Sequence, residues 1–275
     1  MGRNYSASKH FNDRSRLWTS NYNKDENISV NFISRLEAVV NELSNINENR
    51  KIRTAVDLGC GTGPYLPYLS ELAKEVIAID IAPNMIAEAK SNLPKTYNNI
   101  KFINCSTEST PMENNSVDLT IAVGLLEYFT QPMVVLNEAN RMLKSNGILI
   151  ITLPNKYSIP NISGLPRTIS LFLSPEIKIK IANLINRLGI RYVDISSFYL
   201  GETYTKNKIV QLVKKANFQP ISIVSSGYYP FKAFGFDLPH RISIIIHNYL
   251  EKRKSLLFTK NIGNNFICVL RKGKS

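Results

Sequence analysis

Three glycines at alternate positions interrupt a strand-to-helix transition near residue 60. Residues 56–63 read VDLGCGTG, after an apolar strand-like run at 54–58 and before a helical apolar pattern at 64–73. Glycine lets the backbone turn sharply and approach a ligand closely, because no Cβ intervenes. The helix that follows directs unpaired N–H groups and partial positive charge back toward the turn. The segment therefore predicts a ligand-binding loop at the carboxyl end of a strand in an α/β fold.

The glycine spacing excludes two common phosphate-binding loops. A dinucleotide-binding loop needs the pattern G-x-G-x-x-G, but counting from Gly59 or Gly61 places the third position on Pro64 or Leu66. A P-loop would end in Gly-Lys-Ser or Gly-Lys-Thr, and this segment has no such ending. What remains is an acidic residue at position 57 followed by glycines at 59, 61 and 63.

Apolar strand-like segments alternate with helical patterns from residue 54 to residue 154, which predicts a parallel sheet covered on both faces. The predicted strands are 54–58, 75–80, 100–104, 117–123 and 147–154, with helices at 64–73, 84–93 and 132–144. A helix near 205–216 and strands near 220–228 and at 265–272 resume the pattern. We therefore predict an α/β fold with a doubly wound, mostly parallel seven-stranded sheet that ends in a C-terminal antiparallel strand pair.

The departures from this alternation suggest how the chain is divided. Residues 1–50, with apolar residues at helical spacing between 32 and 43, are predicted to form an N-terminal helical cap over a core at 51–154. Residues 155–204 are a lid insertion containing a helix at 176–188, which Ser174-Pro175-Glu176 would begin. Residues 205–275 complete the core and contain a helical insertion at 229–264, including an amphipathic helix at 241–254.

The charge of the chain is concentrated in its second half. The net charge is +13, and residues 155–275 hold 19 Lys and Arg against 5 Asp and Glu. Such asymmetry suggests an anionic partner, although solubility alone would also explain it. No uncharged apolar run approaches the roughly 18 residues of a membrane span, and no secretory segment follows Met1. Three scattered cysteines indicate a reducing compartment and no metal site, so we expect a cytoplasmic protein.

The acid-x-Gly-x-Gly-x-Gly pattern resembles motif I of the class I S-adenosylmethionine (SAM)-dependent methyltransferases, in their small-molecule branch, and the resemblance covers about residues 50–154. It implies SAM as the cofactor. In that family an acid at the end of the second strand binds both ribose hydroxyls, which a carboxylate does well because it accepts two charge-assisted hydrogen bonds. Asp80 stands at that position, and the resemblance implies that Ile81 and Met85 pack against adenine.

Further positions follow the same resemblance with some departures. Cys105 stands where the family usually has the acid that holds the adenine amino group, so Ser106 or a backbone carbonyl would replace that contact. Tyr128 replaces the usual histidine of the Leu-Glu-His pattern, which argues against a base there. The expected cofactor-binding residues are Asp57, Gly59, Cys60, Gly61, Gly63, Asp80, Ile81, Met85, Cys105, Ser106, Thr107, Val123 and Gly124.

The residues that would close the site and carry out the chemistry are less constrained. Residues 10–22 are similar to a family segment that covers the cofactor and the acceptor; ordinary helix packing is the alternative. An oxygen acceptor needs a general base, and His10 and His240 are the candidates, whereas His247 near an apolar helix face is expected to be structural. The residues expected to close over the substrate and cofactor are Arg14, Trp18, Tyr22 and Tyr128.

The sequence thus predicts a SAM-dependent methyltransferase that acts on a small or lipophilic metabolite at oxygen. The basic amphipathic helices are either lid helices packed on the sheet or a surface for an anionic membrane or an acidic carrier protein. One alternative is a tRNA or RNA base methyltransferase that uses the basic half, but no RNA-binding module or Asn/Asp-Pro-Pro-Tyr/Phe motif is present. Another is a SAM-fold protein without methyl transfer, serving as a scaffold or in a different SAM-shaped reaction.

Overall fold

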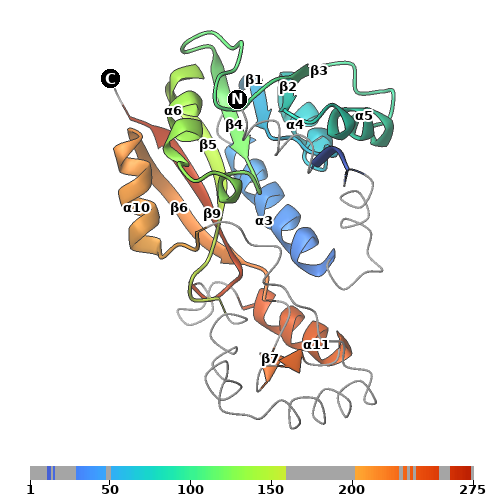
Figure 1. The fold of residues 1–275 in the computed structure, drawn as a ribbon, viewed down its shortest axis with the longest axis vertical. Coiled ribbons are helices and arrows are strands. Elements are labelled where there is room, and N and C mark those ends of the chain that lie inside the picture. Colours follow the sequence, from blue (N-terminus) through green and yellow to red (C-terminus); the bar gives the residue numbers. More distant parts are fainter. Residues whose placement is uncertain are drawn as a thin grey trace.

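The computed structural model describes residues 11–13, 15, 29–47, 51–158, 202–228, 232–233, 236–237, 240–253 and 261–273. Seven strands form one sheet in the order β3-β2-β1-β4-β5-β9-β6 (Figure 1). The first five strands pair in parallel, while β9 runs antiparallel to both of its neighbours, β5 and β6. The strands are β1 (Ile52–Leu58), β2 (Ala73–Asp80), β3 (Ile100–Asn104), β4 (Val117–Ala122), β5 (Leu143–Pro154), β6 (Phe218–Ser226) and β9 (Asn265–Lys272). The predicted fold class is confirmed.

Helices cover both faces of this sheet, because the central strands are apolar on both sides. Along β1, for example, Ala55 packs with one layer and Val56 with the other. The first layer contains α3 (Ser29–Asn47), α4 (Leu66–Leu72) and α5 (Pro83–Asn92), and the second contains α6 (Met133–Met142) and α10 (Lys206–Lys215). Parallel strands between two helical layers bring their loops to one edge of the sheet, where ligands bind in such folds.

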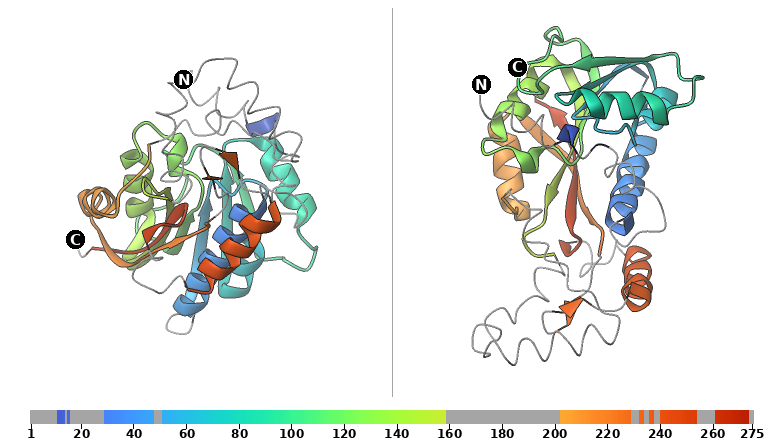
Figure 2. Two further views of the ribbon diagram at one scale, coloured as in Figure 1. Left: turned by 90° about the horizontal axis from the view of Figure 1, so that it is seen from below. Right: turned by 45° about the vertical axis from the view of Figure 1, so that its right-hand side comes forward.

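The parts of the chain outside the core are described incompletely. The predicted helix at 176–188 lies outside the described residues. Within the predicted insertion at 229–264, the short strands β7 (Lys232–Ala233) and β8 (Phe236–Asp237) form an antiparallel pair before α11 (His240–Glu251). Figure 2 shows α11 beyond the N-terminal end of α3. Among the helices described, none has the length and apolar character needed to cross a membrane.

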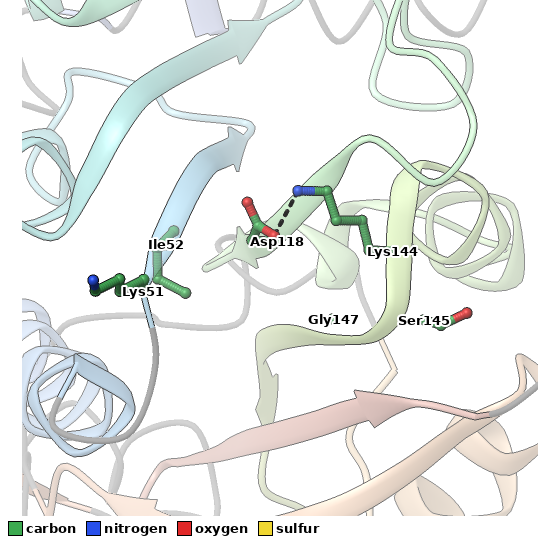
Figure 3. A pocket seen from close by; sticks show the side chains of 6 residues that line it. All are labelled: Lys51, Ile52, Asp118, Lys144, Ser145 and Gly147. Carbon is green, nitrogen blue, oxygen red and sulfur yellow. Dashed lines mark hydrogen bonds and ion pairs between the residues drawn. The ribbon is translucent and has the colours of Figure 1, made fainter.

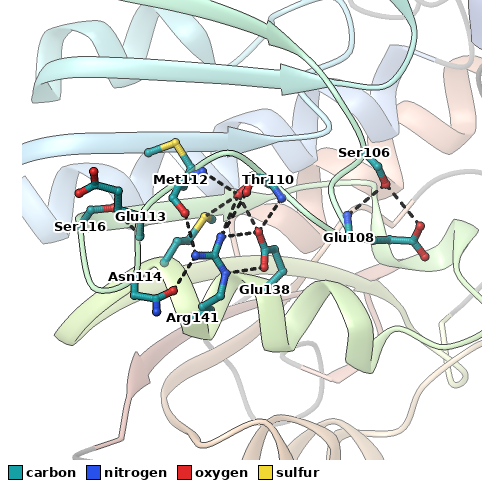
Figure 4. A network of polar contacts seen from close by, with 10 residues as sticks. Ser106, Glu108, Thr110, Met112, Glu113, Asn114, Ser116, Glu138 and Arg141 are labelled. Atoms are coloured by element: carbon teal, nitrogen blue, oxygen red, sulfur yellow. Dashed lines mark hydrogen bonds and ion pairs between the residues drawn. The ribbon is translucent and has the colours of Figure 1, made fainter.

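A buried carboxylate on α6 holds the long loop that follows β3 (Figure 4). Glu138 Oε1 accepts hydrogen bonds from the Thr110 amide at 2.6 Å and the Thr110 hydroxyl at 2.7 Å. Arg141 donates to both oxygens of Glu138 and, through Nη1, to the Met112 carbonyl at 2.7 Å. Burial acts to raise the pKa of Glu138, but the bonds from Arg141 and Thr110 lower it to about 2. Helix α6 thereby fixes the loop that carries residues 105–107.

Replacing Glu138 with glutamine should therefore destabilise the fold. The side-chain NH₂ group of glutamine is a donor, so it could not accept the hydrogen bonds that Thr110 and Arg141 donate to Glu138. We therefore expect Glu138→Gln to lower the free energy of unfolding by about 2–3 kcal/mol near pH 7. Because the folded-state pKa is depressed, this difference is present above about pH 4.5 and shrinks as the pH falls toward 2. Urea unfolding at several pH values measures it. Glu75→Gln, which removes an exposed ion pair with Lys101, is the control and should cost less than about 1 kcal/mol; equal losses would contradict the account.

Candidate functional site

The carboxyl end of β2 holds the glycine turn in place. The Ile79 carbonyl accepts hydrogen bonds from the amides of Gly59 at 2.8 Å and Cys60 at 2.9 Å. The Asp80 carboxylate then bridges two loops: Oδ2 accepts from the Gly61 amide at 2.9 Å, and Oδ1 accepts from the Ala82 amide at 2.8 Å. The turn after β1 and the start of α5 are thus fixed to the same carboxylate.

The loop after β3 is tied to the same point. The Asp80 carbonyl accepts from the Cys105 amide at 3.2 Å and from the Asn104 side-chain amide at 2.8 Å. Beyond it, the Ser106 hydroxyl accepts from the Glu108 amide and lies 3.3 Å from the Glu108 carboxylate. Three loops that sequence analysis assigned to one ligand therefore share one anchor.

The three glycines of the turn have different surroundings. All have positive φ angles (+71°, +52° and +81° for residues 59, 61 and 63), which L-residues adopt only at a cost. A Cβ on Gly59 would lie 2.7 Å from a Leu125 methyl group, and one on Gly63 would lie 3.1 Å from the Cβ of Ala89. A Cβ on Gly61 would meet nothing within 4 Å. Gly59 and Gly63 are therefore packed against the protein, whereas Gly61 faces open space from which a ligand can approach.

Two buried carboxyl groups lie beside this turn. Asp57 is 2% exposed, and its Oδ2 has no hydrogen-bond partner among the described residues. Burial, reinforced by the nearby Asp80 charge, raises the pKa of Asp57 to about 8. Burial also raises the pKa of Asp80, although hydrogen bonds from the Ala82, Gly61 and Ile81 amides oppose the shift. A cationic ligand group would offset the cost of ionising these acids.

The buried thiol of Cys60 shares this environment. Its pKa is raised well above the ordinary value by burial and by the charges of Asp57 and Asp80. The thiol therefore stays protonated and is a poor nucleophile. Cys60 contributes to the turn through its backbone, whose carbonyl accepts from the Gly63 amide at 3.0 Å.

A second polar cluster lies where β4 and β5 end. The Gly124 amide donates to the Thr152 hydroxyl at 2.8 Å, and a Cβ on Gly124 would lie 3.0 Å from the Arg35 guanidinium. Arg35, from α3, forms an ion pair at 4.0 Å with Glu127, from the 3-10 helix η1 (Leu126–Tyr128). Burial raises the pKa of Glu127, and Arg35 lowers it in part. Burial raises the pKa of Tyr204, with smaller contributions from the charges of Glu202 and Glu127.

The N-terminal segment crosses between these clusters. The Phe11 ring contacts the Tyr128 ring edge-on at 5.0 Å between centroids. On the other side, Asn12 Oδ1 accepts from the Asn84 amide at the start of α5 at 2.9 Å, and the Asn12 carbonyl accepts from the Asn84 side chain at 3.3 Å. Residues 11 and 12 thus join α5 to η1 across the carboxyl edge of the sheet.

The structure describes most of the predicted cofactor-binding residues but few of the residues predicted to close the site or act as a base. The residues of the turn, the end of β2 and the following loops surround Gly61 and Asp80, while Met85 and Val123 are buried at 2% and 8% exposure. His240 begins α11, but its side chain lies outside the described part. His10, Arg14, Trp18 and Tyr22 also lie outside the described residues. Each of these assignments stays a prediction.

Sequence reasoning missed the pairing of Arg35 with Glu127. Glu127 belongs to a recognised Leu-Glu pattern, but nothing in that pattern indicates its partner. The signal for Arg35 was available: it is a charged residue between Phe32 and Leu36, on the side of the helix that carries apolar residues.

A hollow of about 210 Å³ lies at the opposite edge of the sheet, where β1, β4 and β5 begin (Figure 3). It includes the ion pair of Lys144 with Asp118, at 2.7 Å. Asp118 also accepts from the Arg53 and Thr54 amides, so this carboxylate connects three strands. The described partners of Asp118 belong to β1 and β5, at the edge of the sheet opposite to the glycine turn.

Comparison with known proteins concerns the domain that contains this edge of the sheet. Residues 56–151 match the family model described as "Methyltransferase domain". The core of this chain is a methyltransferase domain. It is of the class I, SAM-dependent type, with its Rossmann-like sheet.

Curated relatives of this methyltransferase domain include enzymes named for quinone biosynthesis. The ubiquinone biosynthesis O-methyltransferase of Bradyrhizobium diazoefficiens is 30% identical over 101 residues, which are 37% of this chain and 40% of that protein. The demethylmenaquinone methyltransferase of Staphylococcus haemolyticus is 28% identical over 175 residues, 62% of this chain and 70% of that protein. The match to the first of these thus spans about two fifths of that protein's length.

Solved structures show the same fold at low identity. Magnesium protoporphyrin IX methyltransferase from Synechocystis, with bound SAH, has a TM-score of 0.60 at 12% identity, over 98% of this chain and 100% of that one. A [4+2]-cyclase has a TM-score of 0.54 at 14% identity, over 87% of this chain and 81% of that one. At these identities the similarity establishes the fold alone.

The open space at Gly61 gives a direct test of the cofactor site. Gly61→Ala should lower the free energy of unfolding by about 1–2 kcal/mol, the cost of a left-handed L-residue. It should also weaken SAM binding about tenfold or more, because the methyl group would project into the space a ligand occupies. Gly227→Ala is the control: its φ is +78°, but Asn31 and Asn264 are its neighbours. Calorimetry should find a comparable stability loss and unchanged affinity for it; equal affinity losses would contradict this site.

Proposed function

We propose that the chain transfers the methyl group of SAM to an oxygen atom of a small, lipophilic acceptor. The observation that carries the proposal is the open space before Gly61, flanked by two buried carboxyl groups at the ends of β1 and β2. A methyltransferase domain provides the cofactor class, and the acceptor class is inferred from the relatives and from the cluster at the end of β4.

The residues at the carboxyl edge fit the cofactor. The Asp80 carboxylate accepts from the Gly61, Ala82 and Ile81 amides, and because a carboxylate has about four acceptor sites it can still accept a ribose hydroxyl. Asp57 has a buried oxygen and a raised pKa, which suit an ammonium group better than another anion. We propose that Ile81 and Met85 contact the adenine ring, with residues 105–107, Val123 and Gly124 along its rim.

The cluster at the ends of β4 and β5 fits an acceptor that must lose a proton. When bound, the cofactor supplies a methyl group on a positively charged sulfur. Glu127 is a buried carboxylate of raised pKa, and its Oε2 has no hydrogen-bond partner among the described residues. We assign it the role of accepting the hydroxyl proton as the acceptor oxygen bonds to the methyl carbon and the carbon–sulfur bond breaks. His10 and His240 are the alternative bases.

Two other activities compete with this proposal. The surplus of Lys and Arg in residues 155–275 suits an RNA substrate, and a salt-sensitive affinity for RNA would favour an RNA base methyltransferase. The fold also occurs in a [4+2]-cyclase, so the fold alone does not require methyl transfer, and a protein that binds SAM without transferring its methyl group is the second alternative. SAM binding without any methylated product, across lipids, pooled metabolites and RNA, would favour this second alternative.

The role of Glu127 can be separated from cofactor binding. With labelled SAM and a panel of hydroxylated and demethylated quinones, we expect Glu127→Gln to lower kcat about a hundredfold, the usual scale for a lost general base. Its affinity for SAM should stay within about twofold, and the acidic limb of the pH–rate profile should disappear because the group that titrates there is gone. Glu37→Gln, on the exposed side of α3, is the control. An unchanged kcat and acidic limb in Glu127→Gln would exclude this assignment.

A further inference from the structure

Helix α11 buries polar side chains and leaves an apolar stripe exposed. A surface helix normally buries its apolar stripe and exposes its polar residues. In α11 the buried side chains include Ser243, at 0% exposure, and His247, at 5%. Ile242, Ile245 and Tyr249 are instead 48%, 68% and 55% exposed, and their spacing places them on one face. The helix therefore presents an apolar stripe outward.

Polar contacts fix this orientation. The Tyr228 amide donates to His247 Nδ1 at 3.2 Å, so Nδ1 carries no proton and Nε2–H donates to the Ser34 hydroxyl at 2.9 Å. The Ser34 hydroxyl in turn donates to the Val30 carbonyl at 2.8 Å. One turn further along α11, Glu251 accepts from the Gly227 amide at 2.9 Å. A rotation of α11 about its axis that buried Ile242 and Ile245 would break these hydrogen bonds.

The exposed charged residues described on residues 241–253 are all positive. Arg241, Lys252 and Arg253 are exposed beside it, and the Arg253 guanidinium lies 3.9 Å above the Tyr249 ring. The acid of α11, Glu251, is turned inward to the Gly227 amide. A second copy of this face would bring like charges together, which disfavours self-association. An apolar stripe with a tyrosine and flanking cations has the composition of a helix that lies in the surface of an anionic bilayer.

We propose that this face of α11 docks on an anionic lipid membrane. We call it the α11 docking face and define it as Arg241, Ile242, Ile245, Tyr249, Lys252 and Arg253. The isoleucines and the tyrosine enter the interfacial layer, and the three cations contact lipid phosphates. Docking places the carboxyl edge of the sheet near the phase in which a lipophilic acceptor dissolves, and this consequence rests on the proposed function.

One turn of α3 connects the α11 docking face to the site. Ser34 accepts from His247 of α11 and, through its carbonyl, from the Ser226 hydroxyl at 3.0 Å. Its neighbour Arg35 meets Glu127 and Gly124. Figure 1 and Figure 2 show α11 beyond the start of α3, off the end of the sheet where β5 and β6 finish. The α11 docking face and the polar cluster of Arg35, Glu127 and Gly124 are therefore at the same end of the molecule.

Flotation of the full chain with vesicles tests the proposal. The chain should bind vesicles of phosphatidylcholine with about one third phosphatidylglycerol, bind pure phosphatidylcholine at least about tenfold more weakly, and lose affinity as salt rises. Ile245→Asp should weaken binding about tenfold or more, whereas Ile221→Asp, at a residue 50% exposed on β6, should change it less than about twofold. Arg241→Glu with Lys252→Glu should likewise abolish the preference for anionic vesicles. Lys214→Glu with Lys215→Glu, on α10, is the matched control for net charge.

Several results would overturn the docking proposal. These are failure of the folded wild-type chain to bind anionic vesicles at low salt, control variants as defective as the α11 variants, or sedimentation showing a dimer that Ile245→Asp dissociates. Specific capture of an acidic protein by this face without vesicle binding would also overturn it. Vesicle binding is measured without SAM or acceptor, so its failure is distinct from failure of the proposed catalysis. Circular dichroism and unchanged SAM affinity check that each variant is folded.

Discussion

The end of β2 organises the site. The Ile79 carbonyl accepts two amides of the glycine turn, and the Asp80 carboxylate accepts one from the turn and one from the start of α5. The Asp80 carbonyl accepts from the loop after β3. Because these acceptors belong to two consecutive residues of a buried strand, the loops after β1, β2 and β3 keep fixed positions relative to each other. A ligand that meets Gly61 also meets a carboxylate that is already oriented.

Much of this arrangement could be predicted from the sequence. The strand bounds of β3 and β9 agree with the predicted ranges, because both are short apolar runs with clear ends. The positions of Gly61 and Asp80 followed from the strand-turn-helix pattern and the resemblance that it carries. The pairing of Arg35 with Glu127 did not, since it joins segments far apart in the chain and depends on how α3 crosses the sheet. The orientation of α11 could not be predicted either, because helical spacing identifies an apolar face but does not show whether that face is buried.

The two halves of the chain contribute different parts of the proposed function. The nearly neutral first half builds the turn, the two buried acids and the anchor at β2. The basic second half completes the sheet with β6 and β9 and adds α11, whose polar side is hydrogen-bonded to the end of β6 and to α3. The proposed cofactor recognition thus depends on buried groups, whereas the proposed acceptor delivery depends on an exposed face. Helix α3 contacts both.

Proton release on SAM binding tests the central claim most directly. Below its pKa of about 8, Asp57 is protonated in the free protein, and an ammonium group bound beside it would favour the ionised form. Calorimetry at about pH 6.5, in buffers of different ionisation enthalpy, should show release of close to one proton per SAM bound. Release should fall at higher pH and disappear in Asp57→Asn. SAM binding with no proton release in the wild-type chain, or no SAM binding, would contradict the account.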